Sequence, residues 1–337
     1  MMSEVFVRPG EPVQEVLDAA GAGATVRLAE GEFPGSLWIK HPGVSLIGAG
    51  PGRTVLVPGG SAPPGIPPLH EAGEDVLSGI SVHEVAGVTV RGLSLRGFSG
   101  AGVYAHTVTD VVLDDLEALD NAIWGLYVRE STGCEVTSCR ASGSQYAGVA
   151  LSFCGQADAF VADNETSGNA FGIFIDNSSK ARLVRNTCHG NAAGILAVNQ
   201  TYEGEPEGGV TDCLIADNDL YGNGLASGST PGGLGEAGPP ISGVGLALIG
   251  GQRVALVGNH VHDNHPSGPS VMGSAFVVAS SKEWGGDDAF GNHVLWNRVI
   301  GNTPFDFQIG GDPAAHTFEA NLAGAGEPPH LAGWSGP

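Results

Sequence analysis

The sequence predicts an all-β protein built from stacked coils, and three observations support this fold class. Glycine is abundant, at 55 of 337 residues, whereas charged residues make up only 15% of the chain. Short apolar segments that each begin with glycine recur about every 23 residues, and a pair of asparagines recurs in the same phase. Because each interior glycine costs a helix about 1 kcal/mol relative to alanine, this composition disfavours a helical bundle.

The glycine repeat sets the length of one coil. The first six segments begin at Gly79-Ile80, Gly102-Val103, Gly125-Leu126, Gly148-Val149, Gly172-Ile173 and Gly194-Ile195, which are spaced by 22 to 24 residues. After an interruption we expect the pattern to resume at Gly243-Val244 and at Gly273-Ser274. Such a period of short alternating strands without helices is the signature of a parallel β-helix, in which each turn holds about three strands and successive turns stack about 4.8 Å apart.

A second repeat, Asn-x4-Asn, runs in phase with the glycines. It occurs at Asn164/Asn169, Asn186/Asn191, Asn218/Asn223, Asn259/Asn264 and Asn297/Asn302. We expect these side chains to point inward at bends and to hydrogen-bond to their copies in adjacent coils, which satisfies backbone groups that the bends leave unpaired. We expect the repeat glycines to supply the backbone angles that tight corners require.

The N-terminal region predicts a cap on the first coil. A short helix over Val13 to Ala20 precedes a strand-like segment over Thr25 to Leu28. With these features and the coil repeat, residues 5–322 resemble the right-handed parallel β-helix superfamily, which includes pectate lyases and alginate C5-epimerases. The resemblance implies a right-handed single-stranded β-helix with a capping helix. It leaves the function open, because this fold hosts lyases, hydrolases, epimerases and non-enzymes.

The chain is expected to divide into three parts. Residues 1–60 hold the cap and first coils, residues 61–324 the remaining coils, and residues 325–337 a tail. Insertions near 199–242 and at 280–291 interrupt the coils, and loops of this length in a compact fold often act as functional lids.

The charge balance restricts the partners. The chain has 36 acidic and 14 basic residues, a formal net charge of −22, and such a surface repels phosphate backbones and anionic lipids. We therefore expect neither nucleic acid nor membrane as a partner, and no motif indicates a cofactor. The absence of a visible signal peptide and the odd number of five cysteines predict reduced thiols and a cytoplasmic location.

Residues two and four positions after each repeat glycine are expected to face outward, because side chains alternate along a strand. In the first coils these positions bring possible acids, bases and a fixed cation onto one surface. We predict as catalytic residues Tyr104, His106, Tyr127, Arg129 and Asp176. We predict as substrate-binding residues His83, Ser152, Phe174, Leu196, Val198, Asn199, Tyr202 and Trp284. The alternative is an ordinary polar strand face in solvent.

The later coils of the same face become apolar, at Leu196, Val198, Ala247, Ala275 and Val277. Because apolar side chains do not favour free solvent, we expect the insertions to cover this half and to form a pocket. The alternative is an interface between copies of the chain, which would make the protein a homo-oligomer.

A separate pattern, His260-Val261-His262, places two histidines on one side of a strand, and Asp219 occupies the equivalent position one coil earlier. His-x-His is a known metal-ligand spacing. Since no Glu or Cys completes the set, we predict a solvated surface here, with these three residues as the weak metal candidate.

The residue types on the outward face predict proton-transfer chemistry. Tyr and His serve as acid and base, with Arg neutralising a carboxylate, in epimerases and lyases of the superfamily that the chain resembles, although their Asp-Pro-His-Asp and calcium-binding motifs are absent here. The leading prediction is a cytoplasmic isomerase-type enzyme that epimerises, cyclises or shifts a double bond in a small, partly apolar molecule. The alternatives are a lyase or C5-epimerase acting on uronic acid-containing saccharides, and a non-catalytic, oligomerising binding protein.

Overall fold

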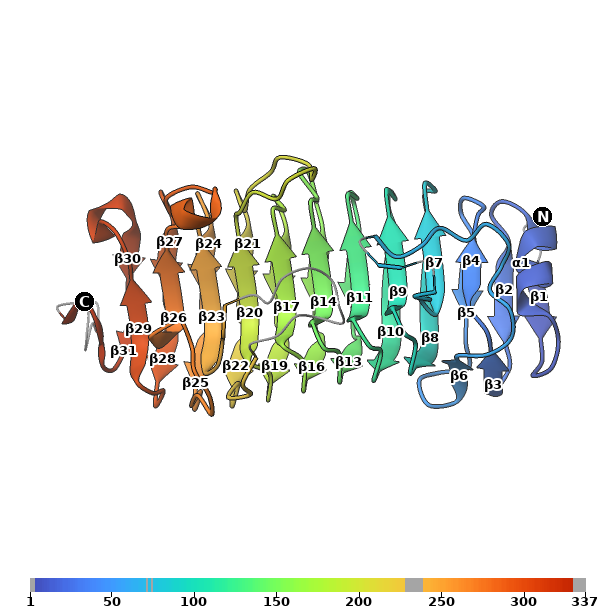
Figure 1. Cartoon of the computed structure of the whole chain (residues 1–337), viewed down its shortest axis with the longest axis horizontal. Helices are drawn as coiled ribbons and strands as arrows, with labels where there is room; N and C mark the ends of the chain where they lie inside the picture. The colour runs from blue at the N-terminus through green and yellow to red at the C-terminus, as the bar shows by residue number, and fades with distance from the viewer. Residues whose placement is uncertain (1–3, 71, 74, 228–238, 330–337) are drawn as a thin grey trace.

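The computed structural model describes residues 4–70, 72–73, 75–227 and 239–329. Its strands wind into a parallel β-helix whose coils stack along the long axis of the molecule, from the N-terminal to the C-terminal end (Figure 1). The predicted fold class is confirmed. Within the described ranges, no helix has the length and apolar character needed to span a membrane.

Three rows of strands form the walls, and neighbours in each row pair in parallel. One row is an 11-stranded sheet: β4 (Leu37–Ile39), β7 (Ile80–His83), β9 (Ala101–His106), β11 (Trp124–Arg129), β14 (Ala147–Ser152), β17 (Phe171–Asp176), β20 (Ala193–Val198), β23 (Val244–Ile249), β26 (Ser274–Ala279), β29 (Phe305–Ile309) and β32 (Gly326–Glu327).

The other two rows join into a 21-stranded sheet through the long strands β8 (Thr89–Arg96) and β10 (Val112–Leu119). One of them also holds β1 (Glu4–Val7), β2 (Thr25–Leu28), β5 (Ser45–Ile47), β12 (Glu135–Thr137), β15 (Phe160–Ala162), β18 (Arg182–Val184), β21 (Leu214–Ala216), β24 (Ala255–Val257), β27 (His293–Leu295) and β30 (Thr317–Glu319). The other holds β3 (Gly31–Pro34), β6 (Thr54–Val57), β13 (Arg140–Ser142), β16 (Glu165–Ser167), β19 (Thr187–His189), β22 (Asp219–Tyr221), β25 (His260–His262), β28 (Arg298–Ile300) and β31 (Leu322–Ala323).

The first coil is capped by the helix α1 (Val13–Ala20), which has the predicted bounds. Its Val13 and Leu17 are buried and close the open end of the core. Two short 3-10 helices, η1 (Lys282–Trp284) and η2 (Pro313–Ala315), lie in connections near the other end. There β32 lies beyond residue 324, where the tail was expected to begin, and residues 330–337 of that tail fall outside the described residues.

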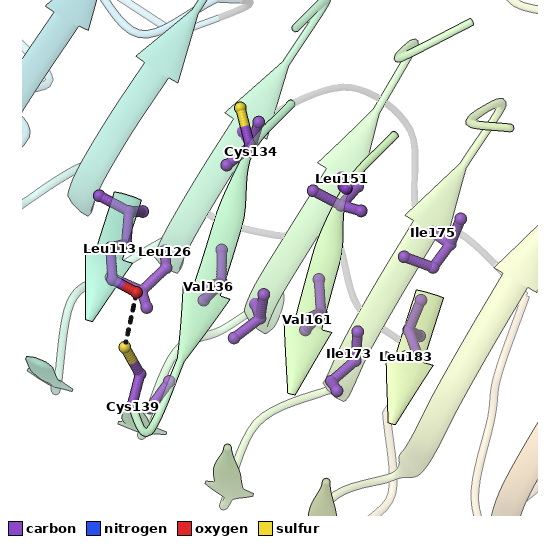
Figure 2. Packing of buried hydrophobic residues seen from close by; sticks show 14 of the residues in the cluster. Leu113, Leu126, Cys134, Val136, Cys139, Leu151, Val161, Ile173, Ile175 and Leu183 are labelled. Atoms are coloured by element: carbon purple, nitrogen blue, oxygen red, sulfur yellow. Dashed lines mark hydrogen bonds between the residues drawn. The ribbon is translucent and has the colours of Figure 1, made fainter. Parts of the chain in front are cut away.

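Aliphatic side chains stack in the interior from one coil to the next. Figure 2 shows Val136, Val161 and Leu183 at paired positions of β12, β15 and β18. Cys139 lies at a bend, and its thiol donates a hydrogen bond to the Leu113 carbonyl at 3.5 Å. All five cysteines are buried and free, and burial raises the pKa of thiols such as Cys139 to about 12. They serve as small apolar core residues.

The asparagine repeat forms the predicted ladders. Asn191, for example, is fully buried, and its Nδ2 donates to Oδ1 of Asn223 in the next coil at 3.0 Å and to the carbonyl of Thr166 at 3.2 Å. Asn169 lies one coil earlier and donates to Asn191 in the same way, at 3.1 Å. Each asparagine therefore satisfies backbone groups at its bend and links two coils.

The repeat glycines have a different role from the one expected. A Cβ on Gly125 would lie 2.3 Å from the carbonyl oxygen of Gly148, and one on Gly172 would lie 2.5 Å from that of Gly194. Neither Gly125 nor Gly172 is among the residues with positive φ. These glycines are therefore required by the close approach of successive coils and not by corner angles.

The register after the interruption also differs from the prediction. Ala193 pairs with Val244, so Gly245 and not Gly243 continues the glycine column, and Ala275 takes this place in the next coil. Ala275 consequently faces the core instead of the outward surface. Gly243 has φ 78° and lies just before β23, which explains why it resembles the start of a repeat.

Candidate functional site

The outward columns predicted from the repeat are present on the 11-stranded sheet. Strand pairing aligns one column in the order His83, His106, Arg129, Ser152, Asp176 and Val198. It aligns the neighbouring column in the order Tyr104, Tyr127, Ala150, Phe174 and Leu196. The five predicted catalytic residues therefore lie on one rigid surface.

This surface is covered by other parts of the same chain. Tyr104, Arg129 and Asp176 are 0%, 1% and 4% exposed. The loop that follows β20 arches back toward the earlier coils (Figure 1) and brings Glu205 onto Arg129. The segment between β6 and β7, which has no repeat signature, covers the first coils with Leu69.

The remaining insertions join this cover. Trp284 of η1 packs against the apolar half of the face, and its carbonyl accepts a hydrogen bond from the Thr201 backbone at 3.0 Å. Ile241 is buried on the same cluster, whereas residues 228–238 of the insertion near 199–242 lie outside the described residues. Leu196 and Val198 are only 5% and 6% exposed, so they are buried without a second copy of the chain.

Aromatic rings fill the end of the face nearest β7. His83 packs edge-on against Tyr104 with ring centres 4.9 Å apart, and Tyr104 stacks on Tyr127 at 5.3 Å. Burial lowers the pKa of His83 to about 4 and raises the pKa of both tyrosines. Burial also lowers the pKa of His106, against the opposing effect of Glu130, whose Oε1 lies 3.4 Å from the imidazole. At neutral pH His83 is therefore a neutral imidazole, and Tyr104 and Tyr127 are protonated phenols.

Arg129 is the cation at the centre of the face. Its guanidinium pairs with Glu205 and lies 3.0 Å from Glu130, and it packs over the ring of Phe153 at 4.5 Å. Burial alone would lower the pKa of Arg129, but Tyr127 and Glu205 hold it above its ordinary value. Glu205 also accepts from His70, whose Nε2 lies 2.9 Å from Oε1. Two covering segments thus meet above Arg129.

Asp176 is a buried carboxyl that projects from the sheet itself onto the face. Burial raises its pKa to about 7, against the opposing effects of hydrogen bonds from Tyr202 and Gln200 and of the Arg129 charge. A buried carboxyl that titrates near neutral pH can take up or release a proton under physiological conditions, which is a property of catalytic groups.

Unpaired polar atoms concentrate at this face. In the described part of the chain, seven buried side-chain polar atoms lack a hydrogen-bond partner, and four of them belong to His83, Tyr104, Arg129 and Asp176. The Arg129 atom is Nε, which lies within ion-pair distance of Glu130 but is not aligned for a hydrogen bond. Because an unpaired buried polar group costs about 1–3 kcal/mol, such a concentration indicates a place where a ligand or water supplies the missing bonds.

The other predicted binding residues surround this centre. Tyr202 packs edge-on against Phe153 at 5.7 Å, and the Ser152 hydroxyl lowers the pKa of Tyr127 by hydrogen bonding, although burial prevails. Asn199 instead ties the covering loops together, since its Nδ2 lies 3.4 Å from Asp287.

Several residues of the face were not predicted. Trp124 stacks on Tyr127 at 4.4 Å, and Tyr146 packs between Trp124 and Phe171. Trp124 and Phe171 each directly precede a repeat glycine. The recurrence of an aromatic residue at this position in two coils was a sequence signal that could have placed them on the face. Glu205 and His70 lie in insertions, where no repeat marks them.

A cavity of about 30 Å³ lies elsewhere, inside the last coils beside Phe276 and Phe307.

The three residues named as a metal candidate, Asp219, His260 and His262, also lie close together. Asp219, His260 and His262 place their donor atoms within 4.8 Å of one another on the outer side of β22 and β25, apart from the covered face.

Comparisons with known proteins agree with this fold. The family model described as "Right handed beta helix region" matches residues 78–282, so the chain belongs to this family. A search of curated proteins found no match.

Among solved structures, the chain is similar to the A-module of the mannuronan C-5 epimerase AlgE4 of Azotobacter vinelandii, with 17% identity, TM-score 0.62 and coverage of 91% of this chain and 92% of that one. It is also similar to the DFA-IIIase of Arthrobacter chlorophenolicus A6, solved without its lid in complex with GF2, with 12% identity, TM-score 0.61 and coverage of 96% and 95%. A third is ORF18 of Geobacillus virus E2, with 10% identity, TM-score 0.61 and coverage of 94% and 59%. At these identities the similarity is one of fold.

Proposed function

We propose that the covered face is the active site of an acid/base enzyme that acts on an acidic saccharide, by C5 epimerisation or by β-elimination. The observation that carries this proposal is that His83, Tyr104 and Asp176 each hold a buried polar atom without a hydrogen-bond partner on the same face as the Arg129 guanidinium. The names of the structurally similar mannuronan C-5 epimerases support the choice of substrate class.

Both reactions begin with removal of the proton on the carbon next to a carboxylate. Arg129 would bind that carboxylate and stabilise the negative charge that develops on it. Asp176, with its pKa raised by burial to about 7, would take the proton as the general base. Tyr127 and Tyr104, which burial keeps protonated, would return a proton to the opposite side of the carbon or to the leaving oxygen.

Substrate access requires the loop after β20 to move. Arg129 is 1% exposed, and the Glu205 carboxylate already lies against its guanidinium. An acidic sugar would therefore replace Glu205 on Arg129, so the loop carries a carboxylate that occupies the substrate position in the closed state. The lid named for the DFA-IIIase structure is in keeping with a moving cover in a protein of this fold.

The test is to incubate the protein with mannuronan, polyguluronate and polygalacturonate. Lyase activity raises the ultraviolet absorbance of unsaturated uronate, and epimerase activity incorporates deuterium from solvent at C5 without that absorbance. Asp176→Asn and Tyr127→Phe should each lower the rate by about 100-fold or more. Tyr221→Phe, on the other sheet, is the matched control and should keep full activity. Conversion that is unchanged in Asp176→Asn and Tyr127→Phe would refute the site assignment.

A second candidate is supported by the apolar half of the face. Trp124, Phe171, Phe174 and Leu196 line a region that a hydrophilic polymer would leave unused. A cytoplasmic isomerase of a small, partly apolar molecule would use the same acid and base on a substrate enclosed by the loops. Thermal-shift measurements distinguish the two, since oligouronates should raise the midpoint under the first proposal and apolar carbonyl compounds under the second.

The non-catalytic, oligomerising alternative has less support, because the chain itself buries Leu196 and Val198. Two results together would favour this alternative. Light scattering would find a stable oligomer, and the Asp176→Asn variant would assemble and bind ligand as the wild type does.

A further inference from the structure

We propose that Asp219, His260 and His262 form a binding site for a divalent transition-metal ion such as Zn²⁺. The site lies on the outer side of the 21-stranded sheet, whereas the covered face belongs to the 11-stranded sheet. It does not depend on the proposed enzymatic function.

The strand register brings the three side chains together. Asp219 of β22 pairs with His260 of β25, and Tyr221 pairs with His262. Val261 points into the core between the two histidines, so both imidazoles project outward. The coils themselves hold the strands that carry the donors, and the cluster needs no loop to assemble it.

The distances fit a tetrahedral ion. Oδ1 of Asp219 lies 3.3 Å from Nδ1 of His260 and 3.2 Å from Nε2 of His262. A zinc ion with ligands at about 2.0–2.1 Å in tetrahedral geometry places neighbouring ligand atoms about 3.3 Å apart. One ion can therefore be coordinated from this side by a carboxylate and two imidazoles, with the fourth position open to water.

The hydrogen bonding of His262 provides an independent indication. Its Nδ1 lies 2.7 Å from Oδ2 of Asp263, and a carboxylate at that distance accepts a proton from the ring. With Nδ1 engaged in this way, Nε2 is the ring nitrogen that faces Oδ1 of Asp219 at 3.2 Å, where a shared ion would be bound. A carboxylate on the far nitrogen is also the usual second partner of a metal-bound histidine.

The surroundings favour a transition metal from solvent. Tyr221 stacks on His262 with ring centres 5.2 Å apart, which orients the ring. The His260 and Asp219 side chains are 41% and 47% exposed, so an ion can enter directly. Two imidazoles with one carboxylate suit Zn²⁺, Co²⁺ or Ni²⁺, whereas Ca²⁺ and Mg²⁺ prefer all-oxygen sites. In the strand register Arg298 of the next coil pairs with His260, and its positive charge acts against cation binding.

The test uses tag-free protein, stripped with chelator and dialysed. Titration with Co²⁺ should give the visible absorption of a four-coordinate ion, and Zn²⁺ should displace it at one ion per chain. His260→Ala, His262→Ala and Asp219→Asn should each abolish this spectrum. Asp263→Asn should weaken binding by about 10–100-fold. His189→Ala, which removes a histidine stacked on Tyr221 from the same surface, is the matched control and should bind normally.

Three results would overturn the proposal: no saturable binding of Zn²⁺ or Co²⁺, one bound ion that persists in both His260→Ala and His262→Ala, or equal competition by Ca²⁺. Circular dichroism of each variant distinguishes loss of the site from loss of the fold.

Discussion

Replacement of Asp176 by asparagine should remove a pH-dependent loss of stability. The carboxyl is 4% exposed, and burial raises its pKa from 3.8 to about 7. The folded chain therefore holds this proton more tightly than the unfolded chain does. The stability that the protonated group contributes is fully present below about pH 4 and is lost as the pH rises through about 7.

The size of the effect follows from the shift. A difference of about three pKa units corresponds to about 4 kcal/mol. For 337 residues at about 2.1 cal/mol/K each, the entropy of unfolding is about 0.7 kcal/mol/K, so 4 kcal/mol moves the thermal midpoint by about 6 °C. Asp176→Asn cannot ionise. Its midpoint should therefore exceed that of the wild type by about this amount at pH 8 and equal it at pH 4.

The assay is thermal unfolding followed by circular dichroism at one scan rate, from pH 4 to pH 8. Asp158→Asn, at an exposed position, is the matched control and should track the wild type at every pH. A difference between Asp176→Asn and the wild type that does not change with pH would refute the raised pKa. A wild type that gains stability relative to the variant as the pH rises would show that Arg129 stabilises the carboxylate more than burial destabilises it.

Three further changes test the cover, the ladder and the coil spacing. Glu205→Ala should lower the free energy of unfolding by about 3 kcal/mol, because it removes a buried partner of Arg129. The double variant Glu205→Ala/Arg129→Met should recover most of that loss. An unchanged denaturant midpoint in Glu205→Ala would contradict the pairing. Asn191→Ala should lower the free energy of unfolding in urea by about 2–4 kcal/mol, since it leaves backbone groups in two coils unpaired. A loss below about 1 kcal/mol would exclude a structural role for the ladder. Gly125→Ala should not yield soluble folded protein, because its Cβ would lie 2.3 Å from a carbonyl oxygen of the next coil. The control Gly190→Ala, at a position with φ 61° and open space, should cost only about 1–2 kcal/mol of folding stability. Equal yields of soluble protein from the two variants would contradict the steric role of Gly125.

Much of the fold could be predicted, because each coil repeats the same physical requirements. Inward aliphatic residues, the asparagines at the bends and the glycines at the points of close approach recur in phase, and this recurrence also predicted which side chains project together, such as Tyr127 and Arg129. The prediction of α1 was confirmed because its apolar face must close an otherwise exposed core. The register error at Gly243 arose because the insertion before it removed the spacing that defined the phase.

The sequence by itself determined the β-helix and the columns of Tyr104, Arg129 and Asp176, since strand alternation and coil spacing are local rules that repeat. Only the tertiary structure decided that these residues are buried, that Glu205 and His70 meet above Arg129, and that burial raises the pKa of Asp176 to about 7. These features depend on where single insertions fold back onto the coils. A segment that occurs once has no repeat to constrain it, and its contacts lie far away in sequence, so its position is set by packing and charge pairing in three dimensions.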